Sequence, residues 1–140
     1  MQPVQSRTPP TARHGVPRVL IVDDEIEHAE ICAALLRRRG YQVAVTMSSA
    51  EAVELAHALK PDLILLDLFM PTVDGFSTAA LLHEHPDTQK VPIVFLSACG
   101  DPAAQTRASE LGAFELLPKP FRAAQLVACV ERSLLRKASL

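Results

Sequence analysis

The segment that most constrains the fold is residues 63–71, with the sequence LILLDLFMP. Four aliphatic residues in a row, instead of an alternating pattern, are typical of a strand buried on both faces of a parallel sheet. Pro71 cannot donate a ladder hydrogen bond, so the strand is expected to end before it. Asp67 then stands at the carboxyl end of a central strand, where open α/β sheets bind their ligands. Taken alone, Asp67 is best interpreted as a turn-forming residue, and it becomes a candidate site only if other polar groups converge on it.

Four other apolar segments alternate with helical patterns along the chain. The predicted strands are residues 19–22, 42–46, 63–67, 91–96 and 114–117. The predicted helices follow each strand, starting at the acidic run 23–25, at Ser48 or Ser49, and near Phe76, Pro102 and Phe121. Five strands alternating with five helices over short connections predict an α/β fold of the (βα)5 type, with a doubly wound five-stranded parallel sheet.

The helix ends carry recognisable signals. Acidic residues in a first turn are favoured by the helix dipole, and Asp is a good N-cap, so the run 23–25 is explained by helix capping alone. Ser48 with Glu51 is a candidate capping box. The apolar faces expected to be buried belong to the first, second and last helices: Ala29, Cys32, Ala33, Leu36; Ala52, Val53, Ala56, Leu59; and Leu126, Val127, Val130, Leu134. His83 and His85 are expected to lie at a solvated helix end, because no further metal ligand has a suitable spacing.

Size and charge restrict the class of protein. The 140 residues suit one domain, and residues 1–17, with four prolines, are predicted to be a flexible tail. A formal net charge of -2 predicts neither nucleic acid nor a membrane as partner. No apolar run approaches the roughly 20 residues of a membrane span, and residues 1–17 have no apolar stretch of the kind a secretory signal requires, so a cytoplasmic location is expected. The cysteines Cys32, Cys99 and Cys129 are interpreted as small buried hydrophobes.

The ends of the predicted strands share polar character. The first ends at Asp23 and Asp24, the third at Asp67, the fourth at Ser97 and the fifth at Lys119. In a parallel sheet all these ends lie on one edge, so the side chains are expected to converge. Three carboxylates this close repel one another and would raise one pKa unless a cation intervened. Hard oxygen ligands suit Mg²⁺.

The motifs VDD, LLDLFMP, LSA and LPKPF, in this order, resemble the receiver domain of two-component response regulators. The resemblance covers residues 18–136, leaving 137–140 as a short tail, and implies a flavodoxin-like strand order 2-1-3-4-5. It implies that Asp67 is the phosphoacceptor, taking a phosphoryl group from a histidine kinase or a histidine phosphotransfer protein. The chain would then be no enzyme beyond its own phosphorylation and dephosphorylation.

The resemblance also implies the roles of the other site residues. Mg²⁺ would be bound directly by Asp24 and Asp67 with the backbone carbonyl of Phe69, and by Asp23 through a water. Three residues would contact the phosphoryl group: Ser97, Lys119 and Ala98.

The sequence departs from the family pattern at the switch position and beside the phosphoacceptor. Leu116 stands where family members carry the Tyr or Phe that swings inward on activation. Leucine has neither a ring nor a hydroxyl, so the usual rotamer switch is in doubt. Phe69 and Cys99 stand where polar residues can orient the water that hydrolyses an acyl phosphate. Both are therefore expected to lengthen the lifetime of phospho-Asp67.

The sequence leaves more than one function open. The leading hypothesis is a single-domain response regulator that signals by docking to a downstream protein, as a monomer or weak homodimer, in a phosphorelay or on a partner kinase or motor. The alternatives are a phosphorylation-independent interaction module and a receiver domain cut from a longer regulator. A metal-dependent phosphatase of similar topology is disfavoured, because this sequence lacks the Asp-x-Asp arrangement after the first strand and a cap domain. A flavin carrier is weaker still, because the first strand leads into acids that would repel the flavin phosphate, where a hydroxyl- and glycine-rich loop would be needed.

Overall fold

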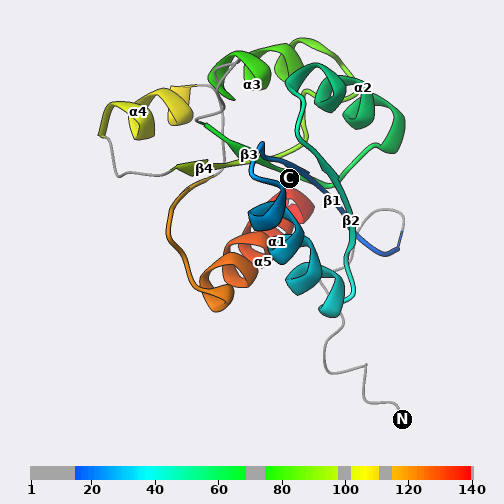
Figure 1. Cartoon of the computed structure of the whole chain (residues 1–140). Coiled ribbons are helices and arrows are strands. Elements are labelled where there is room, and N and C mark those ends of the chain that lie inside the picture. Colours follow the sequence, from blue (N-terminus) through cyan, green and yellow to red (C-terminus); the bar gives the residue numbers. More distant parts are fainter. Residues whose placement is uncertain (1–14, 69–74, 98–101, 111–114, 140) are drawn as a thin grey trace.

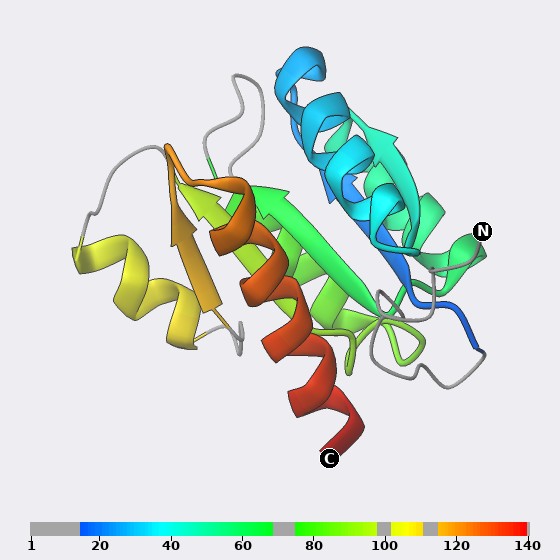
Figure 2. The ribbon, with the colours of Figure 1, turned by 90° about the horizontal axis from the view of Figure 1, so that it is seen from below.

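The computed structural model describes residues 15–68, 75–97, 102–110 and 115–139. Strands and helices alternate along these ranges: β1 (Arg18–Val22), α1 (Ile26–Arg38), β2 (Gln42–Thr46), α2 (Ser49–Leu59), β3 (Leu63–Asp67), α3 (Gly75–Glu84), β4 (Ile93–Ser97), α4 (Pro102–Glu110), β5 (Glu115–Pro118) and α5 (Ala123–Ser139). The strands form one parallel sheet in the order β2-β1-β3-β4-β5 (Figures 1 and 2). The predicted fold class and strand order are confirmed.

The central strands separate two hydrophobic cores. Alternate residues of β3 point to opposite faces: Leu63 and Leu65 join the core under α1 and α5, and Ile64 and Leu66 join the other. Helices α1 and α5 cover one face, and α2 and α3 cover the other (Figures 1 and 2). Helix α4 joins the α2–α3 side through the buried Ala108. Burial on both faces explains why these strands are largely unbroken apolar runs, as in residues 63–66.

The edge strands β2 and β5 are less buried than the centre. In β2 only Thr46 is buried, whereas all five residues of β3 are. Among the described residues, no helix combines the length and apolarity needed to cross a membrane.

The start of α1 differs from the prediction. The helix begins at Ile26, its N-cap is Glu25, and that side chain makes no capping hydrogen bond. Instead, the Glu25 amide donates to Oδ1 of Asp23 over 2.9 Å. The acidic run therefore does not serve mainly to cap a helix, and its carboxylates are available to a site.

Helix α2 forms only half of the expected capping box. Ser48 accepts from the Glu51 amide over 3.2 Å, as predicted. The Glu51 carboxylate instead accepts from the Thr46 hydroxyl over 2.5 Å, and the Ser48 amide donates to the same hydroxyl. The predicted inward face of α2 is buried at Ala52 and Ala56, whereas Val53 and Leu59 are only partly buried. Helix α5 continues beyond Arg136, its predicted end, to Ser139.

Candidate functional site

The carboxyl ends of the central strands bring the predicted polar residues to one edge of the sheet. Asp67 is the last residue of β3 and Ser97 is the last residue of β4, and both are buried. Lys119 follows β5, and its amide donates to the Ser97 carbonyl over 2.5 Å. Asp23 follows β1 and is fully buried. Parallel pairing places these residues together, as the sequence predicted.

Lys119 is the centre of the charged cluster. Its Nζ lies 3.3 Å from Oδ2 of Asp67 and 3.4 Å from Oδ2 of Asp23. It also lies 3.6 Å from Oε1 of Glu25, whose side chain is exposed. The lysine side chain is only 14% exposed, so these charges interact with little screening by solvent. One amine thus neutralises carboxylates that lie at the carboxyl ends of two strands, β1 and β3.

The surroundings of Asp23 and Lys119 keep both side chains charged at neutral pH. Burial raises the pKa of Asp23, but hydrogen bonds from the Glu25 amide and His28, with the charge of Lys119, outweigh it, so this pKa lies below 3.8. Burial lowers the pKa of Lys119, but the charges of Asp23 and Asp67 outweigh it, so this pKa lies above 10.5. The site therefore pairs a permanent cation with an ionised carboxylate.

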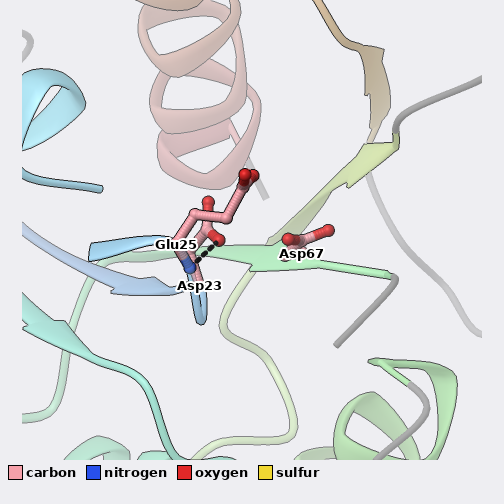
Figure 3. A group of neighbouring side chains, drawn as sticks. All are labelled: Asp23, Glu25 and Asp67. Atoms are coloured by element: carbon pink, nitrogen blue, oxygen red, sulfur yellow. Dashed lines mark hydrogen bonds between the residues drawn. The ribbon is translucent and has the colours of Figure 1, made fainter. Parts of the chain in front are cut away.

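Three carboxylates of the cluster offer a cation site. One oxygen each from Asp23, Glu25 and Asp67 lie within 4.8 Å of one another (Figure 3). Asp67 comes from β3, and the other two come from the link after β1. Three hard oxygen donors, two of them buried, fit Mg²⁺. Within the described ranges Asp24 is half-buried and stands outside this group, so its role as a direct ligand stays a prediction.

Asp24 and Glu25 can be distinguished by magnesium binding. We expect Asp24→Asn to weaken Mg²⁺ binding by about tenfold or more, the range that loss of even a supporting residue produces. Glu25→Gln should weaken Mg²⁺ binding less, because the Glu25 side chain is exposed and its carboxylate is well hydrated even without the ion. A Mg²⁺ titration followed by NMR measures both affinities. Parent-like affinity in Asp24→Asn with a loss in Glu25→Gln would assign the ligand to Glu25 instead.

The stability of the Asp24 variant is a second test. Asp24→Asn should not lower the melting temperature in metal-free buffer, since removing one of several nearby acids reduces their electrostatic repulsion.

His28 is a neighbour of the site that the sequence reasoning missed. Its Nδ1 lies 3.0 Å from Oδ2 of Asp23. Its ring packs edge-on against Phe121 with the centroids 5.5 Å apart, and its Nε2 lies 3.9 Å from the sulfur of Cys32. Side chains in a first helical turn lean toward the helix N-terminus, which is how a residue five positions after Asp23 reaches back to it. Its i, i+4 spacing to the buried Cys32 is the signal that could have found it.

The switch position is part of the core on the α3–α4 side. Leu116 is partly buried and lies opposite Phe95 in the β4–β5 register. Of the predicted buried cysteines, Cys32 and Cys129 are buried and free, and burial raises their pKa values to about 11 and about 12. Phe69, Ala98 and Cys99 lie outside the described residues, and their predicted roles rest on the sequence alone.

Comparisons with known proteins agree with this geometry. Residues 19–131 match the family model described as the response regulator receiver domain. The chain is 35% identical over 122 residues to the DNA-binding dual master transcriptional regulator RpaA of Synechocystis, covering 87% of this chain and 50% of that protein. It is 36% identical over 119 residues to the DNA-binding response regulator MtrA of Mycolicibacterium paratuberculosis, covering 85% and 52%. The chain thus spans about half the length of these relatives.

Solved structures show the same likeness. A putative response regulator from Chloroflexus aurantiacus superposes with a TM-score of 0.81 at 36% identity, covering 86% of this chain and 99% of that one. The chemotaxis protein CheY4 of Vibrio cholerae superposes with a TM-score of 0.82 at 27% identity, covering 85% and 99%. The sequence motifs, the strand order and the acidic edge agree with both comparisons. The chain belongs to the response regulator receiver domain family of two-component signalling.

Proposed function

We propose that this domain accepts a phosphoryl group on Asp67 from the phosphohistidine of a histidine kinase or a histidine phosphotransfer protein. The observation that most supports this is the contact of Lys119 Nζ with Oδ2 of Asp67, 3.3 Å apart at the carboxyl end of β3. A buried carboxylate held beside a cation is arranged to accept a phosphoryl group, because the cation offsets the added negative charge. The family membership supports the same reaction.

The proposed step is a nucleophilic displacement at phosphorus. An Asp67 oxygen forms the new O–P bond, the N–P bond of the donor breaks, and the imidazole leaves, so that an acyl phosphate results. Lys119 stays cationic because its pKa is raised, and it neutralises charge on the transferring group. Mg²⁺, when bound by Asp67 and Asp23 with Asp24 or Glu25, would add to this neutralisation. Ser97 would donate to a phosphoryl oxygen.

The output is proposed to be protein contact. Phosphorylation would bias the surface of this domain between two arrangements that a downstream protein distinguishes. The relatives named above are DNA-binding regulators, and this chain matches about half of their length. Nucleic-acid binding therefore forms no part of the function proposed for these residues.

Intact-mass measurement after incubation with acetyl phosphate and Mg²⁺ tests the acceptor. The parent should gain the mass of one phosphoryl group, and Asp67→Asn should gain none, because an amide is no nucleophile here. Asp87→Asn is the matched control: that side chain is more exposed and pairs with His57 and Lys60, so labelling should be unchanged. Labelling of Asp67→Asn at the parent's level would refute the assignment.

The lifetime of the phosphorylated form is a separate prediction. Because Phe69 and Cys99 offer no group to orient water, phospho-Asp67 is expected to decay slowly. Phe69→Asn should speed the first-order decay by at least about tenfold, a modest share of what positioned proton-transfer groups contribute. Phe69→Leu, which keeps the position apolar, should decay at nearly the parent's rate. Equal decay of the Asn and Leu variants would show that this position does not control water access.

A further inference from the structure

One aromatic ring joins α3, α4 and β4. The guanidinium carbon of Arg107 in α4 lies 4.4 Å from the centroid of the Phe76 ring in α3. Phe76 also contacts Phe95 of β4, whose ring meets it edge-on with the centroids 5.1 Å apart. Phe76 is buried, with 7% of its surface exposed. A cation over an aromatic face is an attractive contact, so Arg107 holds α4 against α3.

Phe76 directly follows Gly75, and Gly75 contacts the backbone at the end of β3, the strand that carries Asp67. A Cβ placed on Gly75 would lie 2.6 Å from the Asp67 carbonyl oxygen and 2.8 Å from the Cα of Leu68. The Gly75 amide donates to the Leu68 carbonyl over 3.2 Å. The backbone at Asp67 therefore touches the first turn of α3, and a shift of one must move the other. Phe76, the next residue, carries that shift to its ring.

A second route from the site to α4 would run through the switch position on β5, where this sequence has Leu116 in place of an aromatic residue. Leu116 lies opposite Phe95 and packs in the core that also holds Phe76 and Ala108. A leucine there fills space but cannot exchange an inward for an outward ring. The contact between Arg107 and Phe76 is thus well placed to sense Asp67 from the α3 side.

We propose that the Arg107–Phe76 contact couples the state of Asp67 to the position of α4. The inference rests on the function proposed above and adds a route, which runs from Asp67 through Gly75 and Phe76 to Arg107. A change at the end of β3 alters the ring face offered to Arg107. The equilibrium between two positions of α4 then changes with the strength of this contact. Exposed cation–π contacts of this kind shift such an equilibrium by about two- to fivefold. That difference between two states is what a population shift requires.

Hydrogen exchange of α4 tests the contact without any phosphoryl donor. In Arg107→Gln the amides of α4 should exchange about two- to fivefold faster than in the parent, because the cation that holds the helix is gone. Arg107→Lys keeps the charge but loses the planar face, and should fall between the two. Arg132→Gln is the matched control, since Arg132 is exposed on α5 and pairs with Glu115 of β5. Parent-like exchange of α4 in Arg107→Gln would overturn the inference.

The coupling is tested by repeating the exchange with Mg²⁺ and beryllofluoride, a mimic of the phosphoryl group. The change in α4 exchange should be smaller in Arg107→Gln than in the parent, while labelling of Asp67 by acetyl phosphate stays at the parent's level by mass. Phe76→Leu should reproduce the loss if the ring carries the route. A labelled Arg107→Gln whose α4 responds as in the parent would overturn this inference alone. An unlabelled parent would instead overturn the proposed function.

Discussion

Replacing Lys119 with methionine is expected to destabilise the domain by about 3 kcal/mol at neutral pH, the cost of removing one partner from a buried ion pair. Methionine keeps an unbranched side chain of similar shape, so the change removes mainly the charge. Asp23 is fully buried and Asp67 nearly so, and both lose the amine that lies 3.4 and 3.3 Å from their oxygens. Two carboxylates that face each other in a poorly hydrated site then repel.

The pH dependence gives this prediction its sign. The pKa of Asp23 lies below 3.8, so its stabilising contribution is present above that value and is lost as pH falls through the folded-state pKa. The pKa of Lys119 lies above 10.5, so its contribution is complete below that value and is lost as pH rises further. The parent should therefore keep this stability between those limits. Lys119→Met should instead become more stable as pH falls from 7 toward 5, because a proton relieves the repulsion.

Urea unfolding of parent and variant at both pH values measures the difference. Mg²⁺ should stabilise Lys119→Met more than the parent, since a bound cation takes over the lost neutralisation. Lys60→Met is the control: Lys60 is exposed and lies 3.8 Å from Asp87, a pair expected to be worth less than about 1 kcal/mol. If Lys119→Met unfolds at the parent's urea concentration, the desolvation of the charges already cancels their attraction.

The sheet could be predicted because its central strands are buried on both faces. The residues of β3 and β4 are buried throughout, and such strands show as unbroken aliphatic runs. The edge strand β5 is harder to delimit: it ends at Pro118, which pairs in register with Ser97, whereas the prediction ended one residue earlier. A proline is tolerated at the end of an edge strand because a missing donor there leaves no ladder bond unmade.

The site was predictable where topology alone places it. Asp23, Asp67 and Lys119 converge because parallel strands end on one edge of the sheet, which needs no knowledge of side-chain conformation. The positions of the Glu25 and His28 side chains depend on where α1 begins and on the rotamers of its first turn, which the sequence pattern does not determine. The acidic run is equally compatible with helix capping.

Glu51 shows the same limit of the sequence pattern. Its spacing to Ser48 fits a capping box, yet a hydroxyl at the end of β2, on Thr46, competes successfully for its carboxylate. Local patterns name the donors and acceptors near a helix end. The choice among several partners is made by tertiary structure, which a spacing rule does not contain.

Gly75→Ala is expected to lower both stability and phosphorylation strongly. A methyl group at this position would lie 2.6 Å from the Asp67 carbonyl oxygen and 2.8 Å from the Leu68 Cα, and neither backbone atom can rotate away as a side chain could. The added methyl must therefore push α3 from the sheet or displace the end of β3. Overpacking of this kind typically costs about 1–3 kcal/mol, and contacts this short to backbone atoms place the cost in the upper part of that range, above the gain of about 1 kcal/mol from the better helix propensity of alanine.

The displacement should reach the chemistry because Asp67 carries both the crowded carbonyl and the acceptor carboxylate. A misplacement of about 1 Å can slow a reaction about 100-fold, so labelling by acetyl phosphate should fall by about tenfold or more in Gly75→Ala. Urea unfolding and the rate of mass gain, measured on the same protein, report the two effects. Ser77→Ala, on the exposed face of the same turn, is the control and should change neither. If Gly75→Ala is as stable as the parent and phosphorylated at the parent's rate, α3 can move outward freely, and the route from Asp67 to Phe76 is not rigid enough to transmit a shift.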